Sequence, residues 1–113
     1  MSARAIFATA TLVALAVAAG SAEAAVIDVH LKEQSFAPKA ISVSPGDTIV
    51  FYNDDKELHS ILLPDNAMLL AEHFIDPGAK REVVIPAAAD PATYNLVCTI
   101  HMNMKGTIQI IAK

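Results

Sequence analysis

Residues 93–104 read TYNLVCTIHMNM and combine a strand pattern with a cluster of nitrogen- and sulfur-bearing side chains. Successive side chains of a β-strand point to opposite faces, so Tyr94, Leu96 and Cys98 share one face while residues 93, 95 and 97 share the other. This alternation predicts a half-buried strand over residues 93–98. Its last residue, Cys98, points inward at the strand's end, and a short loop with a histidine and two methionines follows.

Short strands recur along most of the remaining chain. We predict them from alternating or β-branched residues between turn signals, over residues 27–31, 40–43, 48–53, 60–63, 80–85, 93–98 and 107–111. The turn at residues 44–47 predicts that 40–43 and 48–53 form a hairpin. Residues 65–74 are expected to be irregular, with one helical turn. Together these elements indicate an all-β fold, a Greek-key β-sandwich of about seven or eight strands.

The N-terminus has the pattern of an export signal. Arg4 precedes an apolar run over residues 5–19, and residues 22–24 read Ala-Glu-Ala, a small-x-small cleavage site. We therefore predict a signal peptide at 1–24, a mature start at Ala25 and one domain over 25–113. The apolar run is shorter than the roughly 18 residues expected of a spanning helix, so we expect a periplasmic protein without stable membrane association.

The net charge of the chain indicates which kinds of partner it can bind. The 113-residue chain has a net charge of −4, and removal of Arg4 with Glu23 leaves that value unchanged. An acidic chain without a basic patch does not favour nucleic acid or a membrane surface. We expect protein partners and a monomeric state.

The single cysteine favours a metal ligand over a disulfide. An exported chain with one cysteine cannot form an internal disulfide. Cys98 is followed by His101 and Met104, and His59 supplies a second imidazole from a distant loop. Thiolate and thioether suit Cu(I), imidazole suits either copper state, and structural zinc would need more cysteines. The pattern predicts one copper ion bound by these four residues.

Two methionines could supply the thioether. Met102 adjoins His101, and neighbouring side chains tend to diverge. Met104 leaves room for the loop to turn back over the metal, so it is the favoured ligand, with Met102 as the alternative.

These residues resemble the cupredoxins, the small blue copper proteins, and among the plastocyanin-like members most nearly the amicyanins. The matching features are Val50-Phe51-Tyr52-Asn53 before the first ligand loop, Asn53 six residues ahead of His59, Tyr94 four ahead of Cys98, and C-x2-H-x2-M followed by Lys105-Gly106. The resemblance covers residues 25–113. It implies copper cycling between Cu(I) and Cu(II), held by His59 Nδ1, Cys98 Sγ, His101 Nδ1 and an axial Met104.

The resemblance also implies two supporting roles. The Asn53 side chain would tie the His59 loop to the Thr99 region, and the Ser60 amide would donate to the Cys98 sulfur. The chain departs from the amicyanins where prolines usually flank the ligand histidines. Residues 58, 100 and 102 are leucine, isoleucine and methionine here, which predicts a less rigid ligand loop.

The functional expectation is a one-electron carrier and not an enzyme. Redox partners of dehydrogenase or cytochrome type would dock near His101, Ile100 and Met102, because apolar residues would surround a solvent-edge imidazole. An oxidase or reductase would need further copper sites. The alternative is a periplasmic copper chaperone or storage module. Chaperones favour exposed, methionine-rich sites, and the stretch His101-Met102-Asn103-Met104 leaves this function open.

Overall fold

The computed structural model describes residues 23–112, and this part of the chain is built from strands. They are β1 (Val26–Lys32), β2 (Ser35–Ala37), β3 (Ala40–Val43), β4 (Thr48–Asn53), β5 (His59–Ile61), β6 (His73–Ile75), β7 (Lys80–Val84), β8 (Ala92–Val97) and β9 (Lys105–Ile110). Nine strands therefore form the described part, where the sequence predicted about seven or eight. The two additional strands, β2 and β6, have three residues each.

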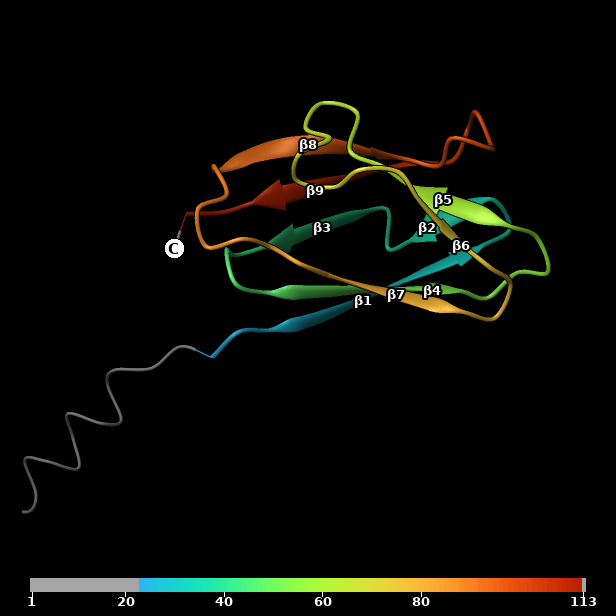
Figure 1. The fold of residues 1–113 in the computed structure, drawn as a ribbon, viewed down its shortest axis with the longest axis horizontal. Coiled ribbons are helices and arrows are strands. Elements are labelled where there is room, and N and C mark those ends of the chain that lie inside the picture. The colour runs from blue at the N-terminus through green and yellow to red at the C-terminus, as the bar shows by residue number, and fades with distance from the viewer. Residues whose placement is uncertain (1–22, 113) are drawn as a thin grey trace, which may run out of the picture.

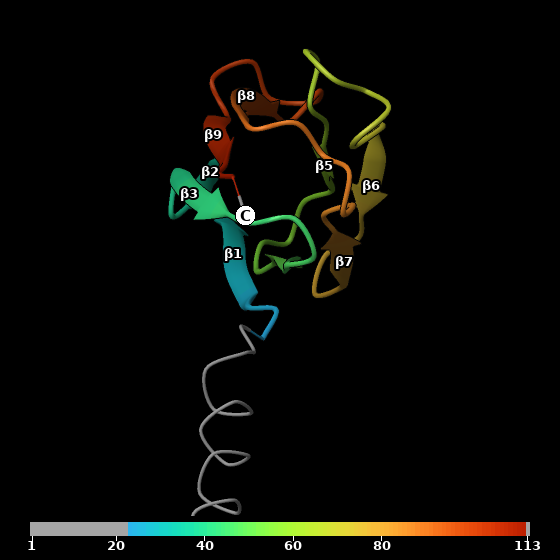
Figure 2. The same ribbon diagram turned by 90° about the vertical axis from the view of Figure 1, so that its left-hand side faces the viewer.

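The strands form two main layers that face one another (Figure 1). One sheet has the order β2-β1-β4-β7 and the other β3-β9-β8, while β5 and β6 make a separate pair. The β1/β4 and β3/β9 pairs are parallel, so the chain crosses between the layers. Figure 2 shows the strands from the end, arranged around the interior. The predicted all-β sandwich is confirmed.

Alternating residues of both layers form the core. In β1, Val29 and Leu31 are buried while Asp28 and His30 are exposed, as the period of two requires. In β8 the inward face is likewise buried. β4 lies between β1 and β7, and its Phe51 is fully buried. Burial of a side chain of this size stabilises a fold by about 1.5–3 kcal/mol.

The prediction that residues 40–43 and 48–53 pair as a hairpin is wrong. The turn itself forms, with Gly46 at a φ of 95° and the Asp47 amide donating to the Ser44 carbonyl. However, β3 pairs with β9 and β4 pairs with β1 and β7. The turn therefore carries the chain from one layer to the other, because both edges of β4 are occupied by other strands.

The prediction of an irregular segment with one helical turn in residues 65–74 is confirmed up to residue 72, because the Leu70 amide donates to the Asn66 carbonyl at 3.2 Å, an i to i+4 hydrogen bond. Residues 64–72 form turns and irregular chain, and β6 begins at His73. Asn66 closes the segment locally, since its side chain and carbonyl both accept from the Leu69 amide. Among residues 23–112, no helix is long and apolar enough to span a membrane.

Two loops that are distant in sequence meet at one end of the sandwich. The loop after β4 and the loop after β8 both lie at the end away from the C-terminus (Figure 1). β5 approaches β8 through paired hydrogen bonds between Leu62 and Val97, of 3.0 and 3.1 Å. This bridge places the start of β5 beside the residue that follows β8.

Candidate metal centre

Three side chains with metal-binding atoms meet at this end of the sandwich. The ligand atoms of His59, Cys98 and His101 all lie within 4.8 Å of one another. Nδ1 of His59 is 3.9 Å from the Cys98 sulfur, and Nδ1 of His101 is 3.6 Å from it. Both imidazoles thus present the same nitrogen to one sulfur. His59 directly follows the loop after β4, and Cys98 and His101 lie in the segment after β8.

The sandwich positions each of these residues differently. His59 opens β5 and is fully buried, whereas Cys98 follows β8 and is 4% exposed. The two segments are tied further by Ser60, whose hydroxyl accepts the Thr99 amide at 2.7 Å. His101 lies at the rim, with its side chain 15% exposed. The site therefore has a buried interior and one imidazole at its solvent edge.

The loop of residues 98–104 closes back on itself. The Cys98 amide donates to the Met104 carbonyl at 3.1 Å, and the Met104 amide donates to the His101 carbonyl at 3.0 Å. Met104 is 1% exposed, whereas Met102 is 89% exposed. Met104 is therefore held inside beside Cys98 while Met102 faces solvent. These positions support the choice of Met104 over Met102 as the thioether ligand.

Hydrogen bonds stabilise the Cys98 sulfur as a thiolate. The Ser60 amide donates to it at 3.3 Å, as the resemblance implied. Burial raises the pKa of the thiol, but the amides of Ser60 and Ile100 lower it, and the two imidazoles lower it further. The pKa falls as a result from 9.0 to about 6. A thiolate is the form that binds metals.

A carboxylate orients the buried imidazole. Nε2 of His59 is 2.6 Å from Oδ2 of Asp55. Burial lowers the pKa of His59, but Asp55 and Cys98 outweigh that effect and raise it. The hydrogen bond to His59 in turn lowers the pKa of Asp55. A proton on Nε2 leaves the Nδ1 lone pair free to face Cys98, the arrangement common among metal-binding histidines.

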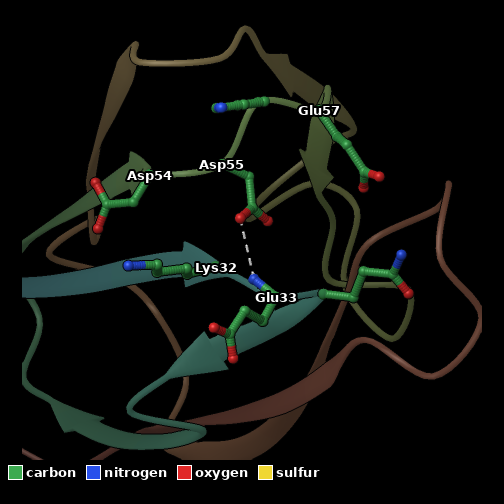
Figure 3. A pocket seen from close by; sticks show the side chains of 7 residues that line it. Lys32, Glu33, Asp54, Asp55 and Glu57 are labelled. Carbon is green, nitrogen blue, oxygen red and sulfur yellow. Dashed lines mark hydrogen bonds between the residues drawn. The ribbon is translucent and has the colours of Figure 1, made fainter.

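Asp55 is itself anchored to the turn between β1 and β2. Its Oδ1 accepts the Glu33 amide at 3.1 Å (Figure 3). Glu33 and Gln34 form this turn with φ of 56° and 54°, a region that non-glycine residues rarely occupy. A charged pocket surrounds this contact, lined by Lys32, Glu33, Gln34, Asp54, Asp55, Lys56 and Glu57. Asp55, in the loop after β4, therefore contacts the buried His59 from the solvent side.

Asn53 does not play the role that the resemblance implied. Its Nδ2 donates to the carbonyls of Glu57 and Ile75, each at 2.8 Å, and its Oδ1 accepts the Asp55 amide at 2.9 Å. It therefore organises the loop before His59 without contacting Thr99. The Ser60 hydroxyl makes the link to Thr99 instead. The Thr99 hydroxyl in turn donates a hydrogen bond to the carboxylate of Glu72.

The acidic residues of the loop after β4 were missed as parts of the site. The sequence suggested a solvated charged turn for residues 54–57, yet Asp55 contacts His59 and Glu57 contacts His101. A carboxylate four residues ahead of a ligand histidine is the sequence signal that could have suggested the first contact. The second depends on how two distant loops meet.

The other two histidines of the described residues lie outside the cluster. His30 is exposed, stacks on Tyr52 and pairs with Asp54 at 2.6 Å. His73 lies 3.4 Å from Arg81. Within the described residues, the groups that could hold a metal form the single set of His59, Cys98 and His101.

The two sulfur-to-nitrogen distances fit a trigonal metal. With bonds of about 2.3 Å to sulfur and about 2.0 Å to nitrogen, ligand atoms at about 120° lie about 3.7 Å apart. The two sulfur-to-nitrogen distances, 3.6 and 3.9 Å, bracket that value. Two imidazoles, one thiolate and a buried thioether form a donor set that suits copper in both oxidation states. The arrangement is typical of a blue copper site.

Comparisons with known proteins agree with this fold. A family model described as a cupredoxin-like domain matches residues 5–110. No curated protein matches the chain. Among solved structures, the Cu(I) form of a mutant of amicyanin superposes with a TM-score of 0.63 at 22% identity, covering 82% of this chain and 88% of that one. A mutant plastocyanin of fern gives a TM-score of 0.61 at 23% identity, covering 74% and 98%.

A third solved structure belongs to a larger protein. The copper-containing nitrite reductase from Thermus scotoductus SA-01 has a TM-score of 0.63 at 26% identity, and the match covers 86% of this chain. It covers only 26% of the reductase chain. The same fold therefore occurs both as a small protein and as part of a longer chain.

Proposed function

Because the chain belongs to the cupredoxin-like family, we propose that it is a blue copper protein that carries single electrons between redox partner proteins. His59, Cys98, His101 and Met104 would hold one copper ion. The observation that carries the proposal is the set of two Nδ1 atoms placed 3.6 and 3.9 Å from one buried sulfur. Copper would supply the one-electron redox couple between Cu(I) and Cu(II).

The chain's own residues suit a carrier because they fix the ligands before any metal binds. His59, Cys98 and Met104 are buried in a packed sandwich. The Asp55 carboxylate holds the orientation of His59, and the Ser60 amide holds that of the Cys98 sulfur. A rigid site changes little between oxidation states, which keeps the cost of electron transfer low. The burial also excludes water and substrates, and this supports a carrier over an enzyme.

His101 is the proposed electron port. It is the ligand at the solvent edge, and Ile100 and Met102 beside it are 44% and 89% exposed. Exposed apolar side chains next to a polar site are typical of docking surfaces. We infer that a dehydrogenase or cytochrome docks here and that the protein acts as a monomer. The fold of the nitrite reductase does not change this assignment, because reduction of a substrate would require an accessible metal.

Copper loading tests the carrier function directly. Addition of Cu(II) to the mature protein should give an intense visible absorption band from thiolate-to-copper charge transfer. Its EPR spectrum should show narrow copper hyperfine splitting. A colourless Cu(I) complex that chelators readily strip would instead favour the copper chaperone or storage alternative, and failure to bind copper would exclude both functions.

Export is the second part of the proposal. Residues 1–24 would act as a cleaved signal peptide and residues 25–113 as the mature domain in the periplasm; residues 1–22 lie outside the described part. The support is the sequence pattern of a basic residue, an apolar run and Ala22-Glu23-Ala24. The intact mass of protein recovered from a periplasmic fraction should correspond to a chain that starts at Ala25. A mass that retains Met1 or an upstream residue would contradict this boundary.

A further inference from the structure

The loop that carries His101 receives little support from packing. Thr99, Ile100, Met102 and Asn103 are all exposed, and His101 is the half-buried residue among them. No proline flanks the histidine. The backbone bond between the Met104 amide and the His101 carbonyl fixes the turn but not the rotation of the ring. The orientation of the imidazole must therefore come from contacts of the ring itself.

Three contacts surround the ring. Nδ1 faces the Cys98 sulfur at 3.6 Å, and the ring meets His59 edge-on with centroids 4.9 Å apart and an interplanar angle of 60°. Nε2, at the opposite side of the ring, lies 3.3 Å from Oε2 of Glu57. A ring flip would exchange a nitrogen for a carbon at both ends. The carboxylate on Nε2 thus favours the one orientation in which Nδ1 faces sulfur.

The backbone at Glu57 is held in place, while its side chain is 57% exposed. Its backbone carbonyl accepts a 2.8 Å hydrogen bond from Asn53, a residue that is 1% exposed. The remaining side-chain bonds of Asn53 go to Ile75 and Asp55. The loop that presents Glu57 is therefore fastened to the core, and it also presents Asp55 to the buried His59.

We propose that Glu57 is the positioning residue of His101, so that one acidic loop orients both imidazoles of the site. This inference rests on the proposed function, in which His101 binds copper. Asp55 holds Nε2 of the interior imidazole, and Glu57 holds Nε2 of the rim imidazole. In this chain the carboxylate replaces the rigidity that prolines beside the histidine would otherwise provide.

Two substitutions separate orientation from charge. Glu57→Ala removes the carboxylate that lies 3.3 Å from Nε2 and should weaken Cu(II) binding about tenfold, the lower end of the roughly 10- to 100-fold loss for residues behind a metal ligand. Glu57→Gln removes the charge but keeps a side-chain oxygen that can face Nε2, so it should restore most of the lost affinity. Glu82→Ala is the matched control, because Glu82 is an exposed residue of β7. It should leave the affinity unchanged.

The measurement is competition of each variant with a chelator for Cu(II), with EPR spectra recorded on the same samples. Wild-type affinity and hyperfine splitting in Glu57→Ala would overturn the positioning role. Equal losses in Glu57→Ala and Glu57→Gln would also overturn it, because they would assign the whole effect to charge. A loss caused by the Glu57 charge alone should shrink at high ionic strength, because salt screens exposed charges, whereas a loss of ring orientation should persist.

A readout without copper keeps this inference separate from the proposed function. In the metal-free protein, NMR relaxation of the His101 ring should show greater ring motion in Glu57→Ala than in wild type or Glu82→Ala. If wild type forms no blue site, the carrier function fails while this measurement still decides the positioning role. Unchanged ring motion in Glu57→Ala would overturn the inference even if copper binds as proposed.

Discussion

Replacement of Cys98 by serine is expected to abolish the visible absorption band of the copper-loaded protein completely. Cys98 is the chain's one cysteine, so no second thiolate can take its place. A serine hydroxyl is not ionised near neutral pH and is a poor ligand for copper in its softer, reduced state. The band arises from thiolate-to-copper charge transfer and should disappear with the sulfur. Visible and EPR spectra after Cu(II) addition provide the measurement.

The Cys98→Ser variant should still fold. Burial of a hydroxyl costs about 1–3 kcal/mol by mutational measures, against a total stability of about 5–15 kcal/mol for a small domain. Thr93→Ser is a suitable control, because Thr93 lies on the exposed face of β8, the strand that Cys98 follows. It should leave the colour unchanged. A Cys98→Ser protein that keeps the blue band would show that the metal site is wrongly assigned.

The sandwich itself could be predicted because its long strands carry a clear period. Burial alternates along β1 and β8 as the residue pattern indicated. β2 was missed because three residues are too few for a period and because its turn, Glu33-Gln34, lacks the glycine or asparagine typical of two-residue hairpins. The error of predicting that β3 pairs with β4 has a different cause. Strand partners are chosen by packing between layers, which a local turn pattern does not report.

The candidate site was predictable to the extent that it is local. Cys98, His101 and Met104 share one short loop, and the structure brings His59 beside them; their role as copper ligands stays a prediction. Asn53 was misjudged because its role was taken from other proteins, and here the Ser60 hydroxyl bonds to Thr99. Asp55 and Glu57 looked like a solvated turn. Their contacts depend on the path of the loop after β4, which no spacing in the sequence specifies.

Met104 and Met102 should respond in opposite ways to substitution. Met104→Ala should lower the free energy of unfolding of the metal-free protein by about 2–5 kcal/mol, because Met104 is buried in the core and truncation leaves a cavity. Met102→Ala should change it by less than about 0.5 kcal/mol, because that side chain is 89% exposed. Denaturant unfolding of the metal-free proteins measures both values.

A third variant separates the packing of Met104 from its role toward copper. Met104→Leu conserves volume, so its cost in the free energy of unfolding should stay below about 1.5 kcal/mol. It removes the sulfur, however, and the axial ligand tunes the redox potential of blue copper sites. The reduction potential and visible spectrum should therefore shift in Met104→Leu and stay unchanged in Met102→Leu. The reverse result would make Met102 the axial ligand, since the buried position of Met104 would then reflect packing alone.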